Sequence, residues 1–359
     1  MWPMTNLTQK LNIKLPLIQA PMAGGITTPA LVAAVSNAGG LGSLGAGYMQ
    51  PDEIRKAIKE IRLLTNKPFA VNLFIPNIYK TDLKKIKKTQ IIIQQSCDIL
   101  KLKTNNKIEN SLDFSSYIPI FDDQVKVVLE EKISVFSFTF GVLPENYIQK
   151  FKDNNTILIG TATNLLEAKM LEENNIDLIV AQGSEAGGHR GTFIGSVSNG
   201  LIGLMALIPQ LADNIHIPII ASGGIMDARG IMAAMTLGAS GIQMGTAFLS
   251  CTESGAFPIY KKMLLNSDAN HTVLTRAFSG KTARGITNQF IRNMIAHEND
   301  ILDYPIQNAL TSEMRKISSQ QNNPEFMSLY AGQGAHLCKS ISASDLIAEL
   351  NTNVTNLLS

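Results

Sequence analysis

The stretch IPIIASGGIMDARGIMAAMTLGASGIQMGTAFL, residues 217–249, places a helical pattern between two short apolar runs. The runs 217–224 and 241–249 are almost continuously apolar, and residues 227–239 repeat apolar residues at helical spacing. Continuous apolar strands joined by a helix are typical of a parallel sheet that is covered on both faces. The stretch therefore predicts one β/α unit of such a sheet.

The same unit recurs through residues 1–250. Strands are expected at 16–24, 41–46, 69–75, 135–141, 156–162, 177–183, 217–224 and 241–249. Helices are expected between them at 27–40, 51–65, 123–132, 144–153, 164–174, 203–213 and 227–239. Eight strands that alternate with helices fit a closed (β/α)8 TIM barrel, which is an α/β fold.

Two segments depart from this rhythm. The first is an insertion at about 76–121. Between Lys80 and Lys107 it contains eight lysines but only two aspartates. Apolar residues at 83, 86, 93, 97 and 100 fall on one helical face, which predicts an amphipathic helix with a solvated lysine face. The alternative is a lid that attracts anionic substrates. The second segment, residues 251–359, is expected to form a smaller, mostly helical domain at the barrel mouth.

Composition narrows the function classes. The 359 residues carry a net charge of +2, which gives no electrostatic reason to expect a nucleic-acid partner. The three cysteines form no metal-binding pattern, so we expect no metal and buried thiols in a reduced compartment. No signal peptide and no apolar run of about 18 residues is found, so a cytoplasmic protein without a membrane span is expected. A homo-oligomer is left open.

The stretch GLGSLG (40–45) satisfies the dinucleotide-binding motif G-x-G-x-x-G literally. That motif must follow a strand and open a helix. Here it follows the expected helix 27–40 and itself contains a strand. We therefore reject a Rossmann domain and interpret these glycines as a helix end and a tight turn.

Glycines at the ends of the last two strands predict a phosphate site. Gly223 and Gly224 end the seventh strand, and Gly245 and Thr246 follow at the eighth. In TIM barrels the loops after these strands commonly bind phosphate, and bare glycines let backbone N–H groups approach an anion. A helix beginning near Asp227 would add its dipole. A single phosphate suggests a mononucleotide, with FMN as the natural candidate.

Other strand ends supply groups for a flat ring. Pro21 and Met22 follow the first strand, where they could lie beside a flavin. Asn72 and Gln182 are uncharged hydrogen-bonding residues at the ends of the third and sixth strands. For both, the alternative is an amide that is satisfied inside the core.

The stretch AQGSEAGGHRGTF (181–193) surrounds His189 with glycines. Either the backbone makes an unusual turn there, or a ligand lies close to the imidazole. Arg190 is expected to point away and pair with a carboxylate, and Glu185 either to brace the loop or to touch substrate. Four residues of the C-terminal segment are candidates for the pocket wall: Tyr260, Lys281, Tyr330 and Gln333.

In order along the chain, several motifs resemble the landmarks of the nitronate monooxygenase family, formerly called 2-nitropropane dioxygenases, and of its first class most closely. The motifs are QAPMAGG (19–25), VNLF (71–74), AQGSEAGGHRGTF (181–193), ASGGI (221–225), GIQMGTAFL (241–249), RAFSGKTARG (276–285) and YAGQG (330–334). The resemblance implies a barrel that uses FMN and molecular oxygen to oxidise alkyl nitronates such as propionate 3-nitronate. It makes His189 the catalytic residue. It implies FMN contacts at Asn72, Gln182, Gly187, Gly224, Gln243, Met244, Gly245 and Thr246.

The imidazole of His189 suits two kinds of substrate. A neutral nitroalkane needs a base for its α-proton, and imidazole titrates near neutrality. A preformed nitronate is an anion, so an imidazolium or a hydrogen-bond donor could hold its oxygens. Two other functions stay open: an FMN-dependent NAD(P)H reductase of a quinone or an enoyl thioester, and a non-catalytic FMN-binding protein.

Overall fold

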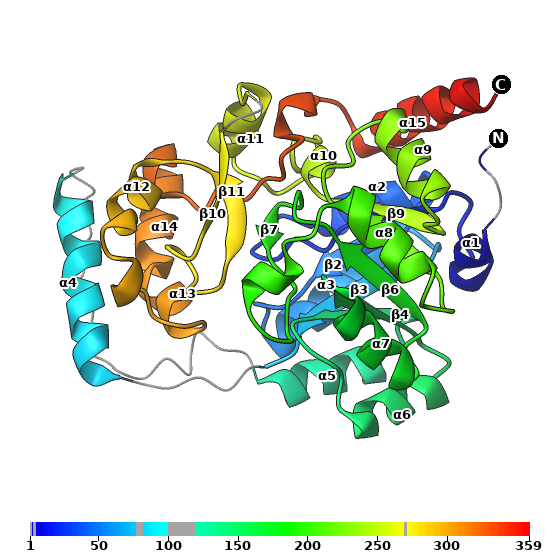
Figure 1. Ribbon diagram of the computed structural model, residues 1–359, viewed down its shortest axis with the longest axis horizontal. Helices are drawn as coiled ribbons and strands as arrows, with labels where there is room; N and C mark the ends of the chain where they lie inside the picture. The colour runs from blue at the N-terminus through cyan, green and yellow to red at the C-terminus, as the bar shows by residue number, and fades with distance from the viewer. Residues whose placement is uncertain (1, 3–4, 77–81, 100–119, 269–270) are drawn as a thin grey trace.

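The structure is a computed structural model that describes residues 2, 5–76, 82–99, 120–268 and 271–359. Eight parallel strands form one sheet in the order β1-β9-β8-β6-β5-β4-β3-β2, and a bridge between Ile18 and Leu41 joins its two edges. The strands are β1 (Leu17–Gln19), β2 (Gly42–Gly45), β3 (Phe69–Phe74), β4 (Val135–Thr139), β5 (Ile157–Ala162), β6 (Leu178–Gln182), β8 (Ile219–Ser222) and β9 (Gly241–Met244). The predicted (β/α)8 barrel is confirmed (Figure 1).

Helices surround these strands where the sequence predicts them. They are α2 (Pro29–Asn37), α3 (Pro51–Leu64), α5 (Phe121–Glu130), α6 (Glu145–Asp153), α7 (Leu165–Glu173), α8 (Leu204–Ala212) and α9 (Ala228–Thr236). Helix α2 begins with a side-chain cap: the Thr28 hydroxyl accepts from the N–H of Leu31, and Pro29 occupies the first turn. The GLGSLG stretch follows α2 and contains β2, as expected.

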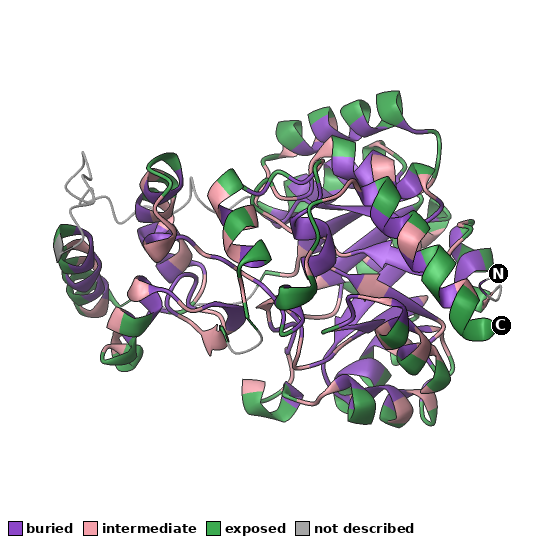
Figure 2. Ribbon diagram, turned by 90° about the horizontal axis from the view of Figure 1, so that it is seen from above, coloured by how far each residue is buried: buried purple, intermediate pink, exposed green. Residues whose placement is uncertain are grey.

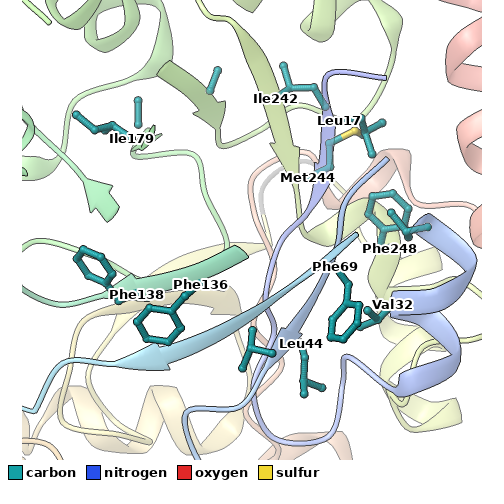
Figure 3. Packing of buried hydrophobic residues seen from close by; sticks show 14 of the residues in the cluster. Leu17, Val32, Leu44, Phe69, Phe136, Phe138, Ile179, Ile242, Met244 and Phe248 are labelled. Carbon is teal, nitrogen blue, oxygen red and sulfur yellow. The ribbon is translucent and has the colours of Figure 1, made fainter. Parts of the chain in front are cut away.

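Apolar side chains pack on both sides of the barrel wall. Most of the core lies between the strands and the outer helices, where Phe136 stacks on Phe151 with ring centroids 4.4 Å apart (Figure 3 shows Phe136 among its neighbours). The bottom of the barrel is filled by residues of the strands together with Leu7 and Leu11 of α1 (Asn6–Leu11). This closed end leaves the opposite, C-terminal ends of the strands as the face where a site can form.

A second lobe stands beside the barrel (Figures 1 and 2). It contains α11 (Pro258–Leu265), β10 (Thr272–Thr275), β11 (Ala283–Ile286), α12 (Gln289–Ile295), α13 (Ile306–Leu310) and α14 (Ser312–Gln320). Strand β7 (Gly188–His189), which leaves the barrel after β6, pairs with β11 in a three-stranded antiparallel sheet. The histidine stretch therefore connects the barrel to the lobe.

The described part of the insertion is helix α4 (Leu83–Ile99), which packs on this lobe. Ile86, Ile93 and Cys97 are buried in one apolar cluster with Phe278 and Phe290, as the amphipathic pattern predicts. Leu83, at the first turn, is half exposed instead, and residue 100 lies outside the described residues. Among the described residues, every helix is too short or too polar to cross a bilayer.

The end of the chain differs from the expected C-terminal domain. Helix α15 (Ala343–Leu358) packs against α2 and α9 of the barrel. Leu346, Ile347 and Leu350 are buried in the barrel's own apolar cluster. Their spacing places them on one apolar face of the helix, and this face packs against the outer side of α2 and α9. The last helix thus belongs to the barrel.

Candidate active site

A cavity of about 660 Å³ opens at the C-terminal ends of the barrel strands and extends under the second lobe. All the site residues that the sequence predicts line this one cavity. They are Pro21, Met22, Asn72, Gln182, Gly187, His189, Gly223, Gly224, Gln243, Met244, Gly245 and Thr246. Tyr260 and Tyr330 of the C-terminal segment line it as well, whereas Lys281 and Gln333 do not belong to its lining. The size is that of a typical cofactor or ligand pocket.

The glycine loops after β8 and β9 present unused backbone donors. Gly223 and Gly224 have φ angles of 139° and 67°, a region that side chains rarely adopt. In the described part of the chain, the N–H groups of Gly223, Gly224 and Gly245 have no hydrogen-bond acceptor. Gly223 and Gly245 are half-buried and Gly224 is exposed, so these donors open into the cavity. Neighbouring backbone N–H groups that point into a concave site are a pattern that suits an anion.

The helix that follows β8 begins with a side-chain cap. Asp227 caps α9, and its carboxylate accepts from the N–H groups of Arg229 and Gly230 at 3.0 and 3.3 Å. The Arg229 guanidinium also pairs with this carboxylate and holds its pKa below the usual range. The carboxylate thus occupies two of the N–H groups at this helix start. Help from the dipole of α9 to a phosphate stays a prediction.

Two of the predicted amides already have partners. Gln182 donates from Nε2 to the carbonyl of His189 at 2.9 Å and accepts from the N–H of Gly191 at 2.8 Å. Its side chain thereby braces the histidine stretch on both sides. Asn72 donates from Nδ2 to the Ser137 hydroxyl at 2.9 Å, and within the described residues its Oδ1 has no donor.

His189 projects from β7 into the cavity, between two aromatic rings. The centroids of Tyr330 and Phe140 lie 5.0 and 6.1 Å from the imidazole centroid, both edge to face. Nε2 lies 2.8 Å from the Ser279 hydroxyl oxygen. Burial, followed by the charges of Lys281 and Arg315, lowers the pKa of His189 to about 3. The imidazole is therefore neutral near pH 7.

The hydrogen bonds of Ser279 favour one tautomer of this imidazole. The hydroxyl has one hydrogen, for which the carbonyl of Lys281 lies 3.1 Å away, and its oxygen also accepts from the N–H of Lys281 at 3.3 Å. If the hydroxyl donates there, it accepts from Nε2–H of His189, and all three groups are satisfied. If it donates to Nε2 instead, the Lys281 carbonyl is left without a partner among the described residues. The first arrangement leaves Nδ1 of His189 without a hydrogen.

Arg190 points away from the cavity, as expected, but its partners differ from those expected. The guanidinium is buried and donates to the carbonyls of Gly183, Gln182 and Gly200 at 2.5, 2.8 and 2.8 Å. No carboxylate lies at salt-bridge distance among the described residues. A turn of chain exposes several carbonyls at once, and a planar guanidinium can bind them together. Nε has no partner among the described residues, and the charges of Glu185 and Glu167 act on the guanidinium from beyond salt-bridge distance.

Two carboxylates hold the histidine stretch. Glu185 accepts from the N–H of Leu204 at 2.9 Å and so braces the loop against α8. Glu167, which sequence reasoning missed, is fully buried and accepts from the N–H groups of Thr163, Phe193 and Ile194 at 2.7, 2.6 and 2.9 Å. The sequence contains one sign of it, because a glutamate three residues after the Asn164 cap is a helix-start pattern.

Comparison with known proteins identifies the family of the chain. The nitronate monooxygenase family profile matches residues 4–353. The chain belongs to the nitronate monooxygenase family. A "Probable nitronate monooxygenase" of Bacillus subtilis (strain 168) is 45% identical over 352 residues, which cover 97% of this chain and 98% of the relative.

Two solved structures share the whole architecture. A nitroalkane oxidase from Streptomyces ansochromogenes is 36% identical with a TM-score of 0.87, over 98% of this chain and 99% of that one. FabK from Thermotoga maritima is 31% identical with a TM-score of 0.76, over 99% and 98%. As a member of this family the chain is an oxidoreductase, and the names of the Bacillus and Streptomyces relatives refer to nitronates and nitroalkanes.

Proposed function

We propose that this enzyme binds FMN in the cavity and uses molecular oxygen to oxidise alkyl nitronates such as propionate 3-nitronate. The observation that carries the proposal is the pairing, in one cavity, of a neutral histidine with a loop of free backbone donors. The family supports oxidation of this substrate class.

The phosphate of FMN fits the loops after β8 and β9. The N–H groups of Gly223, Gly224 and Gly245 would donate to its oxygens, and the glycines leave room for close approach. Asn72 Oδ1, Met22 and Pro21 line the neighbouring part of the cavity, where a flat ring would lie. When bound, FMN supplies the electron-transfer chemistry that no side chain of the cavity can perform.

His189 has a different task with each substrate. With a neutral nitroalkane, Nδ1 of the neutral imidazole takes the α-proton while Nε2–H stays bonded to Ser279. With a preformed nitronate no proton has to move. The lowered pKa speaks against the imidazolium considered from the sequence, so positive charge near the nitronate would come from Lys281 and Arg315.

The ammonium of Lys281 provides positive charge next to the cavity. Its ammonium lies 4.2 Å from the centroid of the Phe140 ring, and Phe140 lines the cavity next to His189. Burial lowers the pKa of Lys281 to about 8, so most of the ammonium is charged at pH 7. Its field reaches the imidazole, where it helps to keep the neutral form.

Two measurements on the purified protein test the proposal. We expect the protein to be yellow and to release intact FMN on denaturation; a colourless protein that FMN cannot restore would refute the cofactor assignment. We also expect anaerobic mixing with propionate 3-nitronate to change the flavin spectrum much faster than mixing with NADH or NADPH. Rapid reduction by a nicotinamide alone would favour the reductase, and no reaction with any of them a non-catalytic flavin-binding protein.

A further inference from the structure

The charged side chains that line the cavity are all basic. Besides the neutral His189 they are Arg315 and Lys316, and no aspartate or glutamate is found in the lining that the described residues form. Both basic residues belong to α14 of the second lobe. A cavity with charges of one sign attracts and retains ligands of the opposite sign.

Arg315 is held in place but has hydrogen-bonding capacity left. Nη2 donates to the backbone carbonyl and the side-chain Oδ1 of Asn308 at 2.8 and 2.9 Å, and Nε donates to the carbonyl of Thr311 at 3.3 Å. Among the described residues, Nη1 has no acceptor and no carboxylate lies at salt-bridge distance. The guanidinium is therefore pre-oriented, and one of its edges is free.

Arg315 differs from two other arginines of the same lobe, which have a carboxylate partner. Elsewhere on the same lobe, Arg276 pairs with Asp303 at 2.9 Å and Arg292 pairs with Glu325 at 3.3 Å. Half-buried arginines normally need an anionic partner or several acceptors, because removing charge from water costs free energy. At Arg315 the missing partner can come from a ligand.

Arg315 acts on the substrate end of the cavity. Burial raises the pKa of Tyr330 and of Tyr48, and the charge of Arg315 counteracts part of each rise. The same charge contributes, after burial and Lys281, to the lowered pKa of His189. Arg315 and the His189 imidazole therefore line the same cavity within electrostatic range of each other. The free donors for the phosphate follow β8 and β9 instead, on the barrel side of the cavity, whereas α14 lies in the lobe beyond β10 and β11 (Figure 1).

We propose that Arg315 binds a carboxylate at the far end of the nitronate, and so selects nitronates that carry a second negative charge. This inference rests on the proposed function. Nη1 donates a charge-assisted hydrogen bond to the carboxylate, which is stronger and more directional than a neutral one. Lys316 is exposed at the entrance and adds attraction without fixed geometry.

Turnover of two three-carbon substrates tests the proposal. Propionate 3-nitronate carries the second charge, and propyl 1-nitronate has a methyl group in its place. We expect Arg315→Gln to lower the ratio of their kcat/KM values by about 10- to 100-fold, mainly through KM. Arg292→Gln, with the same change on an exposed helix of the same lobe, should leave the ratio within twofold. An unchanged ratio in Arg315→Gln would overturn the proposal.

Binding of inert anions separates this inference from the proposed function. With the flavin-loaded protein, spectral titration should show succinate binding at least tenfold tighter than butanoate, and Arg315→Gln should reduce that preference to within about threefold. This result would support the subsite even if no nitronate were turned over. Equal binding of the two anions by the wild type would overturn it, because the guanidinium would then bind no second charge. Loss of FMN in Arg315→Gln would also overturn it, because the guanidinium would then bind the phosphate.

Discussion

The imidazole of His189 is kept neutral by its surroundings. It is half-buried between the rings of Tyr330 and Phe140, and two cations lie within electrostatic range. Each of these factors penalises a positive charge on the ring. The consequence is an imidazole that is unprotonated near pH 7, with its hydrogen-free nitrogen favoured by the hydroxyl of Ser279. The same factors weaken it as a base in the empty cavity, because they also act on the protonated ring.

Replacement of His189 by asparagine tests the role of this base. His189→Asn should retain FMN, because the imidazole faces the substrate and not the phosphate loops. Turnover of a neutral nitroalkane, if the wild type has it, should fall by about 10²-fold or more, since asparagine cannot accept the proton. Turnover of a preformed nitronate should fall much less. Equal small losses with both substrates, measured as kcat/KM, would reduce His189 to a support of the loop.

The lowered pKa also predicts a pH dependence of stability. The unfolded chain protonates His189 near pH 6.5, whereas the folded chain keeps it neutral down to about 3. As the pH falls below 6.5, the unfolded state therefore binds a proton that the folded state refuses, and stability is lost. Between pH 7.5 and 5 this amounts to about 2 kcal/mol.

Urea unfolding of the flavin-free protein measures this loss. Other groups titrate over the same range, but they do so equally in the wild type and in His189→Asn. The wild type should therefore lose more stability than the variant on going from pH 7.5 to pH 5. Equal losses would mean that the folded protein accepts the proton and that the imidazole is not buried away from water.

Replacement of Ser279 tests the choice of tautomer. Ser279→Ala removes the oxygen that Nε2–H donates to, and the preference for that tautomer should disappear. The 15N chemical shifts of a labelled His189 ring should then move from a pure Nε2–H pattern to a mixture. The rate with a neutral nitroalkane should fall about tenfold. An unaltered ring spectrum would show that Ser279 only packs against the histidine.

At the scale of elements, the loops after β8 and β9 are expected to hold the phosphate mainly through backbone donors. Asp227 occupies two N–H groups at the start of α9, whereas the N–H groups of Gly223 and Gly224 have no acceptor among the described residues. Their unusual φ angles orient these N–H groups, and a side chain would strain that geometry. Binding should therefore depend on the glycines more than on any charged residue nearby.

Gly224 offers a matched test of this dependence. Its φ is +67°, and a new Cβ would lie 3.1 Å from the Cβ of Glu185. Gly224→Ala should weaken FMN binding at least tenfold and destabilise the fold by about 1–2 kcal/mol. Gly195 has a φ of +73°, so Gly195→Ala carries similar backbone strain. Because Gly195 lies outside the cavity lining, this variant leaves the proposed phosphate site unchanged. FMN titration should show no loss in this control; similar losses in both variants would mean that strain, and not the phosphate, decides.

At the scale of the whole molecule, distant parts of the chain build the lobe that covers the barrel. Helix α4, from the insertion, packs on the same cluster as Phe278 and Phe290 of the C-terminal segment. The Thr89 hydroxyl donates to the carbonyl of Asp300 at 2.6 Å across this contact. Because Phe278 precedes Ser279, the packing of α4 supports a loop of the active site.

Two substitutions on α4 separate its two faces. Ile93→Ala removes a buried side chain and should cost about 2–5 kcal/mol of unfolding free energy. Lys87→Glu reverses a charge on the exposed face and should change stability by no more than about 0.5 kcal/mol. Nitronate kcat/KM should stay within twofold in Lys87→Glu. A large loss there would instead favour the lid that attracts anionic substrates.

The sequence by itself determined that the chain forms a barrel and which strand ends line its opening. Apolar runs and helical repeats are local patterns, and eight of them in alternation allow few architectures. In a parallel barrel the carboxyl ends of all strands meet at one face. Chain order was therefore enough to predict that Asn72, Gln182 and Gly245 line one cavity, although the sequence did not predict which partners their side chains would have.

Tertiary structure alone decided the contacts between distant segments. The bond between His189 and Ser279 joins residues 90 positions apart, and Arg315 reaches the cavity from a helix still further along. Helix α15 returns to the barrel after the lobe is complete. No periodicity or spacing in the sequence predicts these contacts. They depend on how whole elements pack and on which polar groups the packing leaves without a partner.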